Sequence, residues 1–246
     1  MSFYAIIPAR YDSTRFPGKP LTLIFDRPMF VHVYERACQC PGLDGVYLAT
    51  DDERIVQAAQ AHSVPVIPTS PEHHSGTDRV MEAAERLGLR EQDVVLNIQG
   101  DEPALAPQML AELLEPLKDD RVQVATLARR IERSEADSPH VVKAVLDSQY
   151  RALYFSRALI PHHAEGGRSK DRFWGHVGMY GFRVLALKAF TRLGTGYLES
   201  TEKLEQLRFL EAGFSIHVAP TQWKSRGVDR PEDVPLVEQL MRQEQQ

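Results

Sequence analysis

The chain has 246 residues, of which 43% are hydrophobic and 26% are charged. This length suits one large domain or two small ones, and the composition is that of a globular protein rather than a disordered chain. With 29 Lys and Arg against 34 Asp and Glu, the formal net charge is −5. A mildly acidic chain without a basic block argues against nucleic acid or a membrane surface as a partner.

The cysteines and the N-terminus indicate a cytoplasmic protein. Cys38 and Cys40 cannot form a disulfide scaffold in a chain of this length, and we expect both to be reduced thiols. No apolar run approaches the ~18 residues that would span a bilayer. The first residues run into a predicted strand with no basic region before it, so we expect no signal peptide.

The first half of the chain alternates predicted strands with predicted helices. Short apolar runs predict strands at residues 3–8, 45–50, 64–68 and 93–98. Apolar residues at helical spacing predict helices at residues 30–38, 52–62, 77–87 and 110–117. Such alternation predicts right-handed βαβ units and a doubly wound, mostly parallel α/β sheet.

The second half of the chain has a different pattern, with strand-like segments and few helices between them. Strands are predicted at residues 122–129, 141–146, 152–157 and 174–183. A helix is predicted from about Glu199, and another begins near Pro231. We expect antiparallel strands appended to the parallel core, in a single α/β domain over residues 1–246 with halves of about 1–120 and 121–246. The polar stretch at 161–167 predicts an exposed loop.

Positive charge is concentrated in the loop at residues 8–20, after the first predicted strand. The loop holds Arg10, Arg15 and Lys19, and Ser13 and the backbone amides can also donate hydrogen bonds to oxyanions. Because open α/β sheets bind ligands at the carboxyl ends of their strands, a polyphosphate suits this loop best. It has neither the P-loop pattern nor G-x-G-x-x-G, which argues against a nicotinamide dinucleotide. The alternative is a solvated, charged loop.

Two aspartates are candidates for a metal site. Asp101 follows the apolar strand at 93–98, so its carboxylate is expected at the same edge of the sheet as the basic loop. Mg²⁺ is often held by one or two carboxylates together with substrate phosphates. Asp229, in Gly-Val-Asp-Arg-Pro, is a second ligand if the fold brings it beside Asp101. For both residues the alternative is a carboxylate that caps the following helix.

Small donors precede the predicted helix at 77–87. Ser75, Gly76 and Thr77 offer backbone N–H groups and hydroxyls to a base, a ribose or a phosphate, and Arg79 follows them. An ordinary N-cap explains Ser75 or Thr77 equally well. The chain has no G-x-S-x-G elbow and no Cys-His signature, so nucleophilic hydrolysis is unsupported.

The strand at 174–182 carries a mixed aromatic and histidine face. A period of two places Trp174, His176, Tyr180 and Phe182 on one side, where hydroxyl and imidazole donors suit a sugar. A core aromatic stripe is the alternative, and it is preferred for Trp174 and Phe182. The same half offers three further polar candidates for a sugar acid: Arg157, Glu205 and Gln206.

Seven motifs together resemble those of the 3-deoxy-manno-octulosonate cytidylyltransferases, and the resemblance runs almost end to end. They are IIPARYDSTRFPGKPL (6–21), HHSGTDR (73–79), NIQGDEP (97–103), LYFSRALIP (153–161), HVGMYGFR (176–183), LEQLR (204–208) and GVDRPEDV (227–234). The related sialic-acid cytidylyltransferases look different, with a first loop richer in glycine and no Gln-Gly-Asp-Glu-Pro block. Arg230 departs from the small polar residue expected before Pro231.

The resemblance implies a Rossmann-like nucleotidyltransferase fold whose appended antiparallel strands form a homodimer. It implies transfer of CMP from CTP to the anomeric hydroxyl of 3-deoxy-D-manno-octulosonate (Kdo), with release of pyrophosphate, for lipopolysaccharide synthesis. It also implies Mg²⁺ held by Asp101 and Asp229. Two alternatives stay open: a related sugar acid, 8-amino-Kdo or sialic acid, as substrate, and a nucleotide-binding module without catalysis.

The resemblance also assigns residues to each substrate. The implied CTP-binding residues are Ala9, Arg10, Ser13, Arg15, Lys19, Ser75, Gly76, Thr77, Arg79 and Gln99. The implied catalytic residues are Arg10, Arg15, Lys19 and Asp101. The implied sugar-binding residues are Gln99, Arg157, His176, Tyr180, Glu205 and Gln206.

Overall fold

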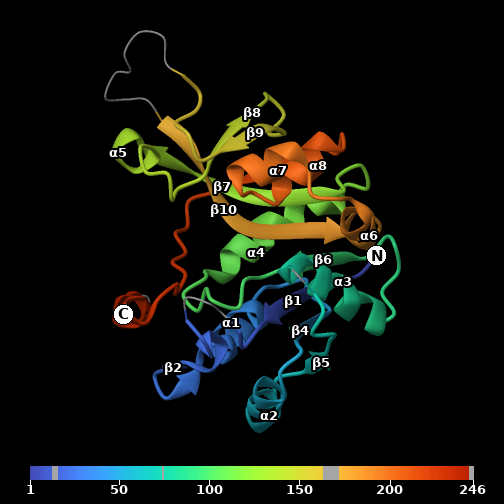
Figure 1. Cartoon of the computed structure of the whole chain (residues 1–246), viewed down its shortest axis with the longest axis vertical. Coiled ribbons are helices and arrows are strands. Elements are labelled where there is room, and N and C mark those ends of the chain that lie inside the picture. The colour runs from blue at the N-terminus through green and yellow to red at the C-terminus, as the bar shows by residue number, and fades with distance from the viewer. Residues whose placement is uncertain (13–15, 74, 163–171, 244–246) are drawn as a thin grey trace. The chain divides into compact units, whose positions relative to one another are not determined.

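The computed structural model describes residues 1–12, 16–73, 75–162 and 172–243 (Figure 1). The chain divides into two compact units. The first consists of Met1–Ala111 and Lys224–Gln246, and the second of Glu112–Trp223. The C-terminal segment therefore groups with the first unit, whereas the sequence-based division placed it with the second half.

The sheet of the first unit is parallel, with the strand order β6-β1-β4-β5. Its strands are β1 (Phe3–Ala9), β4 (Gly45–Thr50), β5 (Val66–Pro68) and β6 (Val94–Asn97). Every residue of β6 is buried, as its continuous apolar run predicts. The predicted strands of this half are confirmed, although β5 begins two residues later than the apolar run at 64–68.

Helices on both faces make this sheet doubly wound. The helices of this unit are α1 (Met29–Cys38), α2 (Glu53–Ala61), α3 (Gly76–Arg86) and α9 (Val234–Gln243), with 3₁₀ turns η1 (Lys19–Leu21) and η3 (Pro231–Asp233), and α4 (Pro107–Leu114) contains the boundary between the units. A short hairpin joins β2 (Leu23–Ile24) to β3 (Arg27–Pro28). The crossovers through α1 and α2 advance along the sheet and the one through α3 returns, so right-handed connections place α3 on the opposite face.

The reversal of strand order falls between β1 and β6. Their carboxyl ends therefore flank the topological switch point, where open α/β sheets bind ligands. Ile6 pairs with Asn97 in the register of these two strands, which brings the loop after β1 next to the loop after β6. The two loops pack closely at Gly100, where a Cβ atom would lie only 3.0 Å from the carbonyl oxygen of Pro8.

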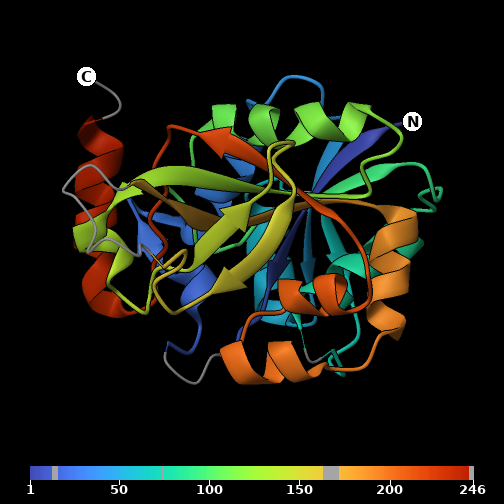
Figure 2. The ribbon, with the colours of Figure 1, turned by 90° about the horizontal axis from the view of Figure 1, so that it is seen from above.

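The second unit carries the predicted antiparallel strands. They are β7 (Val124–Glu132), β8 (Lys143–Leu146), β9 (Ala152–Ser156) and β10 (Arg172–Arg183). β10 pairs antiparallel with β7 and β8, and β8 and β9 lie side by side as the yellow-green pair (Figure 2). A strand that the sequence did not predict, β11 (Ile216–Thr221), adds to β7 in parallel.

The helices of the second unit are short. They are α5 (Arg133–Ala136), α6 (Val184–Arg192), α7 (Tyr197–Glu202) and α8 (Gln206–Glu211), with the 3₁₀ turn η2 (Glu115–Lys118). The prediction of one helix from Glu199 is wrong in its continuity. Lys203 adopts a left-handed conformation, φ 56°, which ends α7 before α8 begins.

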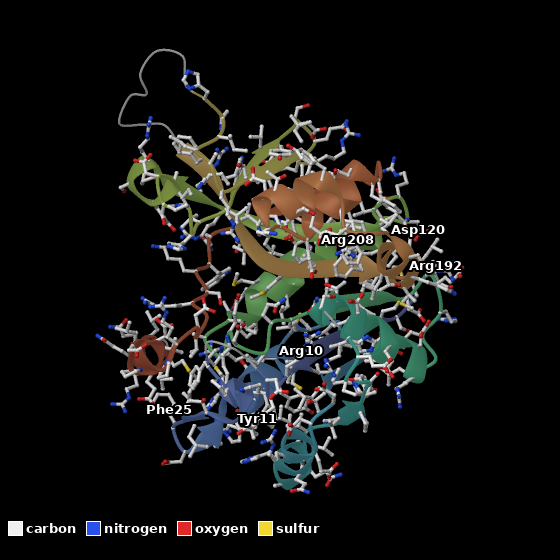
Figure 3. All side chains as sticks on the ribbon, viewed as in Figure 1. Arg10, Tyr11, Phe25, Asp120, Arg192 and Arg208 are labelled. Carbon is white, nitrogen blue, oxygen red and sulfur yellow. The ribbon has the colours of Figure 1, made fainter. Side chains whose placement is uncertain are left out.

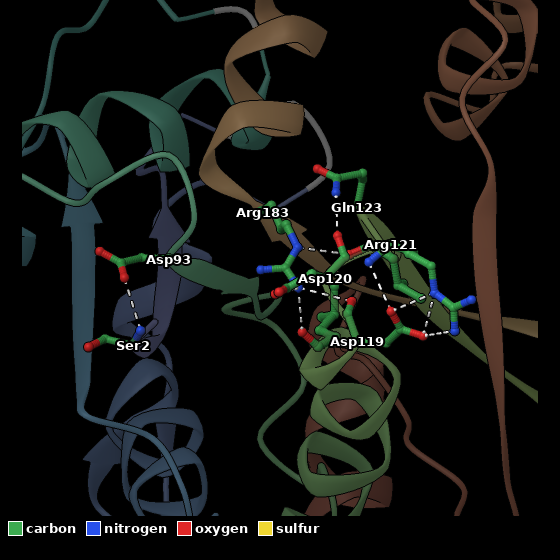
Figure 4. A network of polar contacts seen from close by, with 9 residues as sticks. Ser2, Asp93, Asp119, Asp120, Arg121, Gln123 and Arg183 are labelled. Carbon is green, nitrogen blue, oxygen red and sulfur yellow. Dashed lines mark hydrogen bonds and ion pairs between the residues drawn. The ribbon is translucent and has the colours of Figure 1, made fainter.

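Buried charges tie chain segments together in both units (Figure 4). Asp93, only 3% exposed, accepts hydrogen bonds from the backbone N–H of Ser2 at 2.9 Å and from Nη2 of Arg90 at 3.0 Å. In the second unit, Arg183 donates to the carbonyl oxygens of Leu117 and Asp119, both at 2.9 Å. The first contact fixes the start of β1 against the start of β6.

Replacing Asp93 with Asn is expected to destabilise the fold in a pH-dependent way. Burial alone would raise the pKa of Asp93, but the bonds from Arg90 and Ser2 outweigh it and lower the pKa to about 2. Because the pKa of Asp93 is lower in the folded chain than in the unfolded chain, its carboxylate stabilises the fold at pH values above the unfolded-state pKa. This stabilisation is lost as the pH falls toward 2. Urea titrations should therefore show a loss of about 2 kcal/mol at pH 7 that shrinks between pH 5 and pH 3. An equal loss at both ends of that range would contradict this assignment.

The structure describes both cysteines, and its helices can be compared with the length needed to span a membrane. Cys38 is exposed and Cys40 is buried, and both are free thiols. Burial raises the pKa of the Cys40 thiol to about 11, so this residue packs as a small neutral group. None of the helices in the described ranges is both long and apolar enough to cross a membrane.

Candidate active site

Two contacts hold Tyr11, which follows Arg10 after β1 (both labelled in Figure 3). The backbone N–H of Gly18 donates to the carbonyl oxygen of Tyr11 at 2.9 Å, and Gly18 has the left-handed φ of 72° that this closure requires. The guanidinium carbon of Arg54 lies 3.2 Å from the centre of the Tyr11 ring. Of the predicted loop residues, Ser13 and Arg15 lie outside the described residues.

Lys19, Asp101 and Asp229 form a charged cluster at the switch point. The ammonium of Lys19 donates to Oδ2 of Asp101 and lies 3.8 Å from Oδ1 of Asp229. The side chain of Lys19 is 15% exposed, against 31% for Asp101 and 60% for Asp229. The carboxylates therefore open toward solvent around one cation, although 128 positions separate the two aspartates along the chain.

The carboxylates of Asp101 and Asp229 suit a divalent cation. Mg²⁺ prefers oxygen ligands and usually takes one or two carboxylates together with substrate phosphates and water. Both aspartates face the same ammonium, so they point toward a common position. Within the described residues, no group of three or more His, Cys, Asp or Glu could hold a metal by protein ligands alone. The donor set fits an ion that shares its coordination with a phosphate substrate.

The role of helix cap falls to Asp233 rather than to Asp229. Oδ2 of Asp233 accepts hydrogen bonds from the backbone N–H groups of Asp229 and Arg230, both at 3.0 Å. Pro231 stands at the first position of the 3₁₀ turn, as predicted. The Asp229 carboxylate lies 3.8 Å from the Lys19 ammonium, and its assignment as a metal ligand stays a prediction.

Glu102 and Ser225 adjoin this cluster and were not singled out by the sequence. The hydroxyl of Ser225 donates to Oε2 of Glu102. Burial raises the pKa of Glu102 to about 7; the Ser225 hydrogen bond opposes this shift, and the neighbouring charge of Asp101 adds to it. The adjacency of Glu102 to Asp101 was a usable signal, whereas nothing near Ser225 in the sequence pointed to it.

A cavity of about 420 Å³ lies beside the cluster. It is lined by residues from the loops after β1 and β6 and from the start of α3. They are Pro8, Ala9, Arg10, Asp12, Lys19, Pro20, Gly76, Gln99, Gly100 and Asp101. The fold thus brings together five of the predicted CTP-binding residues and one predicted metal ligand, in a space large enough for a nucleotide.

A second cavity, of about 260 Å³, shares Arg10 and Asp12 with the first. Arg79 lines this cavity and is fully buried. Its Nη2 lies 3.0 Å from Oδ2 of Asp51, and its Nη1 donates to Thr69. Its Nε is buried without a hydrogen-bond partner in the described part of the chain. Asp51, which follows β4, was not predicted as part of the site.

The start of α3 combines capping with a place at the cavity. Oγ of Ser75 accepts from the backbone N–H of Asp78 at 3.1 Å, so Ser75 is the N-cap. Thr77 is buried, whereas Gly76 lines the larger cavity and packs against Pro8. Ser75 therefore serves the helix, and its neighbour Gly76 leaves backbone room for a ligand.

In the second unit, His176 and Tyr180 form a hydrogen-bonded pair. Nε2 of His176 lies 3.0 Å from both the Tyr180 hydroxyl and Oγ1 of Thr126. Burial lowers the pKa of His176 to about 3 and raises that of Tyr180 well above its usual value. Both groups are therefore neutral near pH 7 and can only exchange hydrogen bonds. Space is open at Gly178, where an added Cβ would have no neighbour within 4 Å.

The other predicted sugar-binding residues divide into two places. The charge of Glu205 acts on Tyr180, and the adjacent Gln206 is buried with Nε2 lacking a hydrogen-bond partner among the described residues. Arg157 is held elsewhere by main-chain carbonyls, with Nε 3.0 Å from Glu202 O and Nη1 3.2 Å from Pro139 O. Phe182 stacks on Phe209 in the core, as preferred from the sequence.

The class of protein follows from these features. A doubly wound sheet with a cation and two carboxylates at its switch point is suited to binding and transferring part of a nucleoside triphosphate. The profile of the cytidylyltransferase family matches residues 4–216, and the chain belongs to that family.

Relatives narrow the comparison further. The chain is 54% identical over 243 residues to a 3-deoxy-manno-octulosonate cytidylyltransferase of Nitratidesulfovibrio vulgaris (strain DP4), covering 98% of this chain and 96% of that one. It is 45% identical over 245 residues to an 8-amino-3,8-dideoxy-manno-octulosonate cytidylyltransferase of Shewanella sp. (strain ANA-3), covering 98% and 99%. A solved structure of CMP:2-keto-3-deoxy-manno-octonic acid synthetase complexed with CTP superimposes with a TM-score of 0.93, at 41% identity over 99% of this chain and 100% of that one.

These comparisons confirm the resemblance read from the motifs. They also confirm the expected fold class, a mostly parallel nucleotidyltransferase sheet with an antiparallel strand lobe. The assignments of individual residues to CTP, Mg²⁺ and the sugar stay predictions, supported by the cavity and by the contacts described above.

Proposed function

We propose that this protein transfers CMP from CTP to the anomeric hydroxyl of Kdo and releases pyrophosphate. The observation that carries the proposal is the cluster of Lys19, Asp101 and Asp229 beside a 420 Å³ cavity at the switch point. The match of the whole chain to Kdo cytidylyltransferases supplies the identity of the substrates.

The chemistry needs positioning and charge neutralisation more than a covalent step. The anomeric hydroxyl attacks the α-phosphorus in line, and pyrophosphate leaves as negative charge develops on its oxygens. Arg10 and Lys19 stabilise this charge, with Arg15 as a third cation of the same loop. Mg²⁺, held by Asp101 and Asp229, supplies further neutralisation of the triphosphate when bound. Gly76 and Gln99 line the space for the nucleotide, and Arg79 lines the adjoining cavity. Ser75 and Thr77 are assigned to the nucleotide by the family resemblance alone.

The side chains assigned to the sugar acid differ in the hydrogen bonds that they already make. Gln206 has a buried amide nitrogen that a sugar hydroxyl would satisfy. His176 and Tyr180 are neutral and offer hydroxyl and imidazole groups beside the open space at Gly178. Arg157 would exchange its bonds to the Glu202 and Pro139 carbonyls for the sugar carboxylate, while Glu205 and Gln99 would bind hydroxyls.

We also propose a compartment, an oligomeric state and a pathway for this enzyme. We place the enzyme in the cytoplasm, as a homodimer that supplies activated Kdo for lipopolysaccharide synthesis. Free thiols at Cys38 and Cys40 agree with a reducing compartment. Exposed apolar side chains on the second unit, Leu153 and Tyr197, agree with a surface that a second copy covers.

A pyrophosphate-release assay tests the proposal. Purified protein with CTP and Mg²⁺ is expected to release pyrophosphate when Kdo is added, and less with 8-amino-Kdo or sialic acid. Faster turnover of 8-amino-Kdo than of Kdo would show that 8-amino-Kdo is the substrate. Binding of CTP without pyrophosphate release for any of the sugars would favour a non-catalytic nucleotide-binding protein.

A further inference from the structure

Asp229 lies on a segment with no regular structure of its own. Residues 222–229 form neither helix nor strand between β11 and the 3₁₀ turn η3. A carboxylate on such a segment can adopt many positions unless other contacts fix it, and a metal ligand needs a fixed position. The question is therefore which contacts hold this segment beside Asp101.

Val228 joins the main chain of the segment to the loop that carries Asp101. Its backbone N–H donates to the carbonyl oxygen of Asp101 at 2.8 Å. Its side chain is fully buried in a cluster with Ala104 and Val237. These contacts and the bond from the Asp229 N–H to Asp233 hold the end of the segment, and a second anchor precedes Gly227.

Ser225 and Glu102 provide that second anchor. The Ser225 hydroxyl donates to Oε2 of Glu102, the residue that follows Asp101. Both side chains are half-buried, so the bond is partly shielded from competing water. Side-chain and main-chain contacts therefore run in parallel between the same two segments, Ser225 to Glu102 and Val228 to Asp101.

We assign Glu102 to the positioning of Asp229 and not to the metal ligands themselves. The Glu102 carboxyl lies beside Asp101, which already contacts Lys19. Oε2 of Glu102 is engaged by the Ser225 hydroxyl, so this oxygen is bonded to the segment that carries Asp229. The Ser225 bond thus ties the residues before Asp229 to the residue that follows Asp101.

We infer that the Glu102–Ser225 pair is a positioning pair that fixes Asp229 beside Asp101 for the divalent cation. The inference rests on the proposed function in its choice of metal ligands. It adds two residues that act through Asp229 and do not themselves touch the cation or the substrate.

Binding of Mn²⁺ to the full chain, followed by the electron paramagnetic resonance signal of the free ion in the presence of CTP, tests this inference. Ser225→Ala is expected to weaken Mn²⁺ binding about 10-fold, the usual effect of removing an outer-shell partner. Ser225→Thr keeps the hydroxyl and is expected to bind Mn²⁺ as the unchanged chain does. Ser200→Ala, which removes an exposed serine hydroxyl bonded to Gly196, is the matched control and should leave Mn²⁺ binding unchanged.

A double variant separates positioning from a general loss of structure. If Ser225 acts through Asp229, then Asp229→Ala with Ser225→Ala should bind Mn²⁺ no more weakly than Asp229→Ala alone. Unchanged Mn²⁺ affinity in Ser225→Ala, or additive losses in the double variant, would overturn the inference. A chain that binds Mn²⁺ and CTP with these dependences but releases no pyrophosphate would instead refute the proposed function and leave the positioning pair standing.

Discussion

Replacement of Asp101 with Ala is expected to lower kcat/KM for CTP by about 30-fold to about 5,000-fold while the protein stays folded. The carboxylate contacts Lys19 and, with Asp229, supplies the oxygen ligands of the cation. Its loss removes one partner from a partly desolvated set of charges around the triphosphate, which costs roughly 2–5 kcal/mol. Because Asp101 is 31% exposed and its side chain lies in a loop after β6, the fold does not depend on it.

Pyrophosphate release at several Mg²⁺ concentrations measures this effect, and circular dichroism checks the fold. Asp101→Asn keeps the shape of the side chain and removes its charge, so it should lose nearly as much activity as the Ala variant. Asp119→Ala is the matched control, since that exposed carboxylate pairs with exposed Arg121 on the second unit. Near-native turnover by Asp101→Ala would refute the assignment of this residue to the metal.

The part of the site that follows β1 and β6 could be predicted, because the sequence indicates both the motifs and the strands that precede them. A buried apolar run that opens into Gly-Asp-Glu, and a first strand that opens into a basic loop, must share an edge in a parallel sheet. Local sequence does not contain the position of Asp229. Its segment returns to the first unit after the whole of the second, and contacts of the folded chain, such as the backbone bond from Val228 to Asp101, show where it arrives.

The prediction for β10 succeeded despite a break in its pairing. Val177 faces Leu127 and Tyr180 faces Thr126, so Gly178 and Met179 have no partner opposite in β7. An insertion of two residues preserves the alternation of faces, and His176 and Tyr180 remain on one side. An insertion of one residue would have separated them, and period-two reasoning could not have told the two cases apart.

Other features lay beyond sequence reasoning because they depend on single conformations or distant partners. The left-handed Lys203 divides the predicted helix into α7 and α8, although lysine is not a residue that signals a break. The pairing of Arg79 with Asp51 joins α3 to the end of β4, and neither residue alone indicates it. In both cases tertiary packing outweighs the local pattern.

Replacement of Lys19 with Ala is expected to change turnover and metal binding in opposite directions. Loss of a cation that stabilises the leaving pyrophosphate should lower kcat by about 10²- to 10³-fold. The same ammonium now lies between Asp101 and Asp229 and competes with a divalent cation for them. Without it the two carboxylates repel each other, so Mn²⁺ should bind more tightly in the absence of CTP.

This opposition distinguishes Lys19 from the metal ligands, since Asp101→Ala should lower turnover and Mn²⁺ affinity together. Lys19→Arg should not restore turnover, because a planar guanidinium cannot occupy the position of a compact ammonium between two carboxylates. Lys118→Ala, which removes an exposed ammonium paired with Glu115, is the matched control and should leave both quantities unchanged. Weaker Mn²⁺ binding in Lys19→Ala would show that Lys19 supports the arrangement of the carboxylates, and the competition argument would then be wrong.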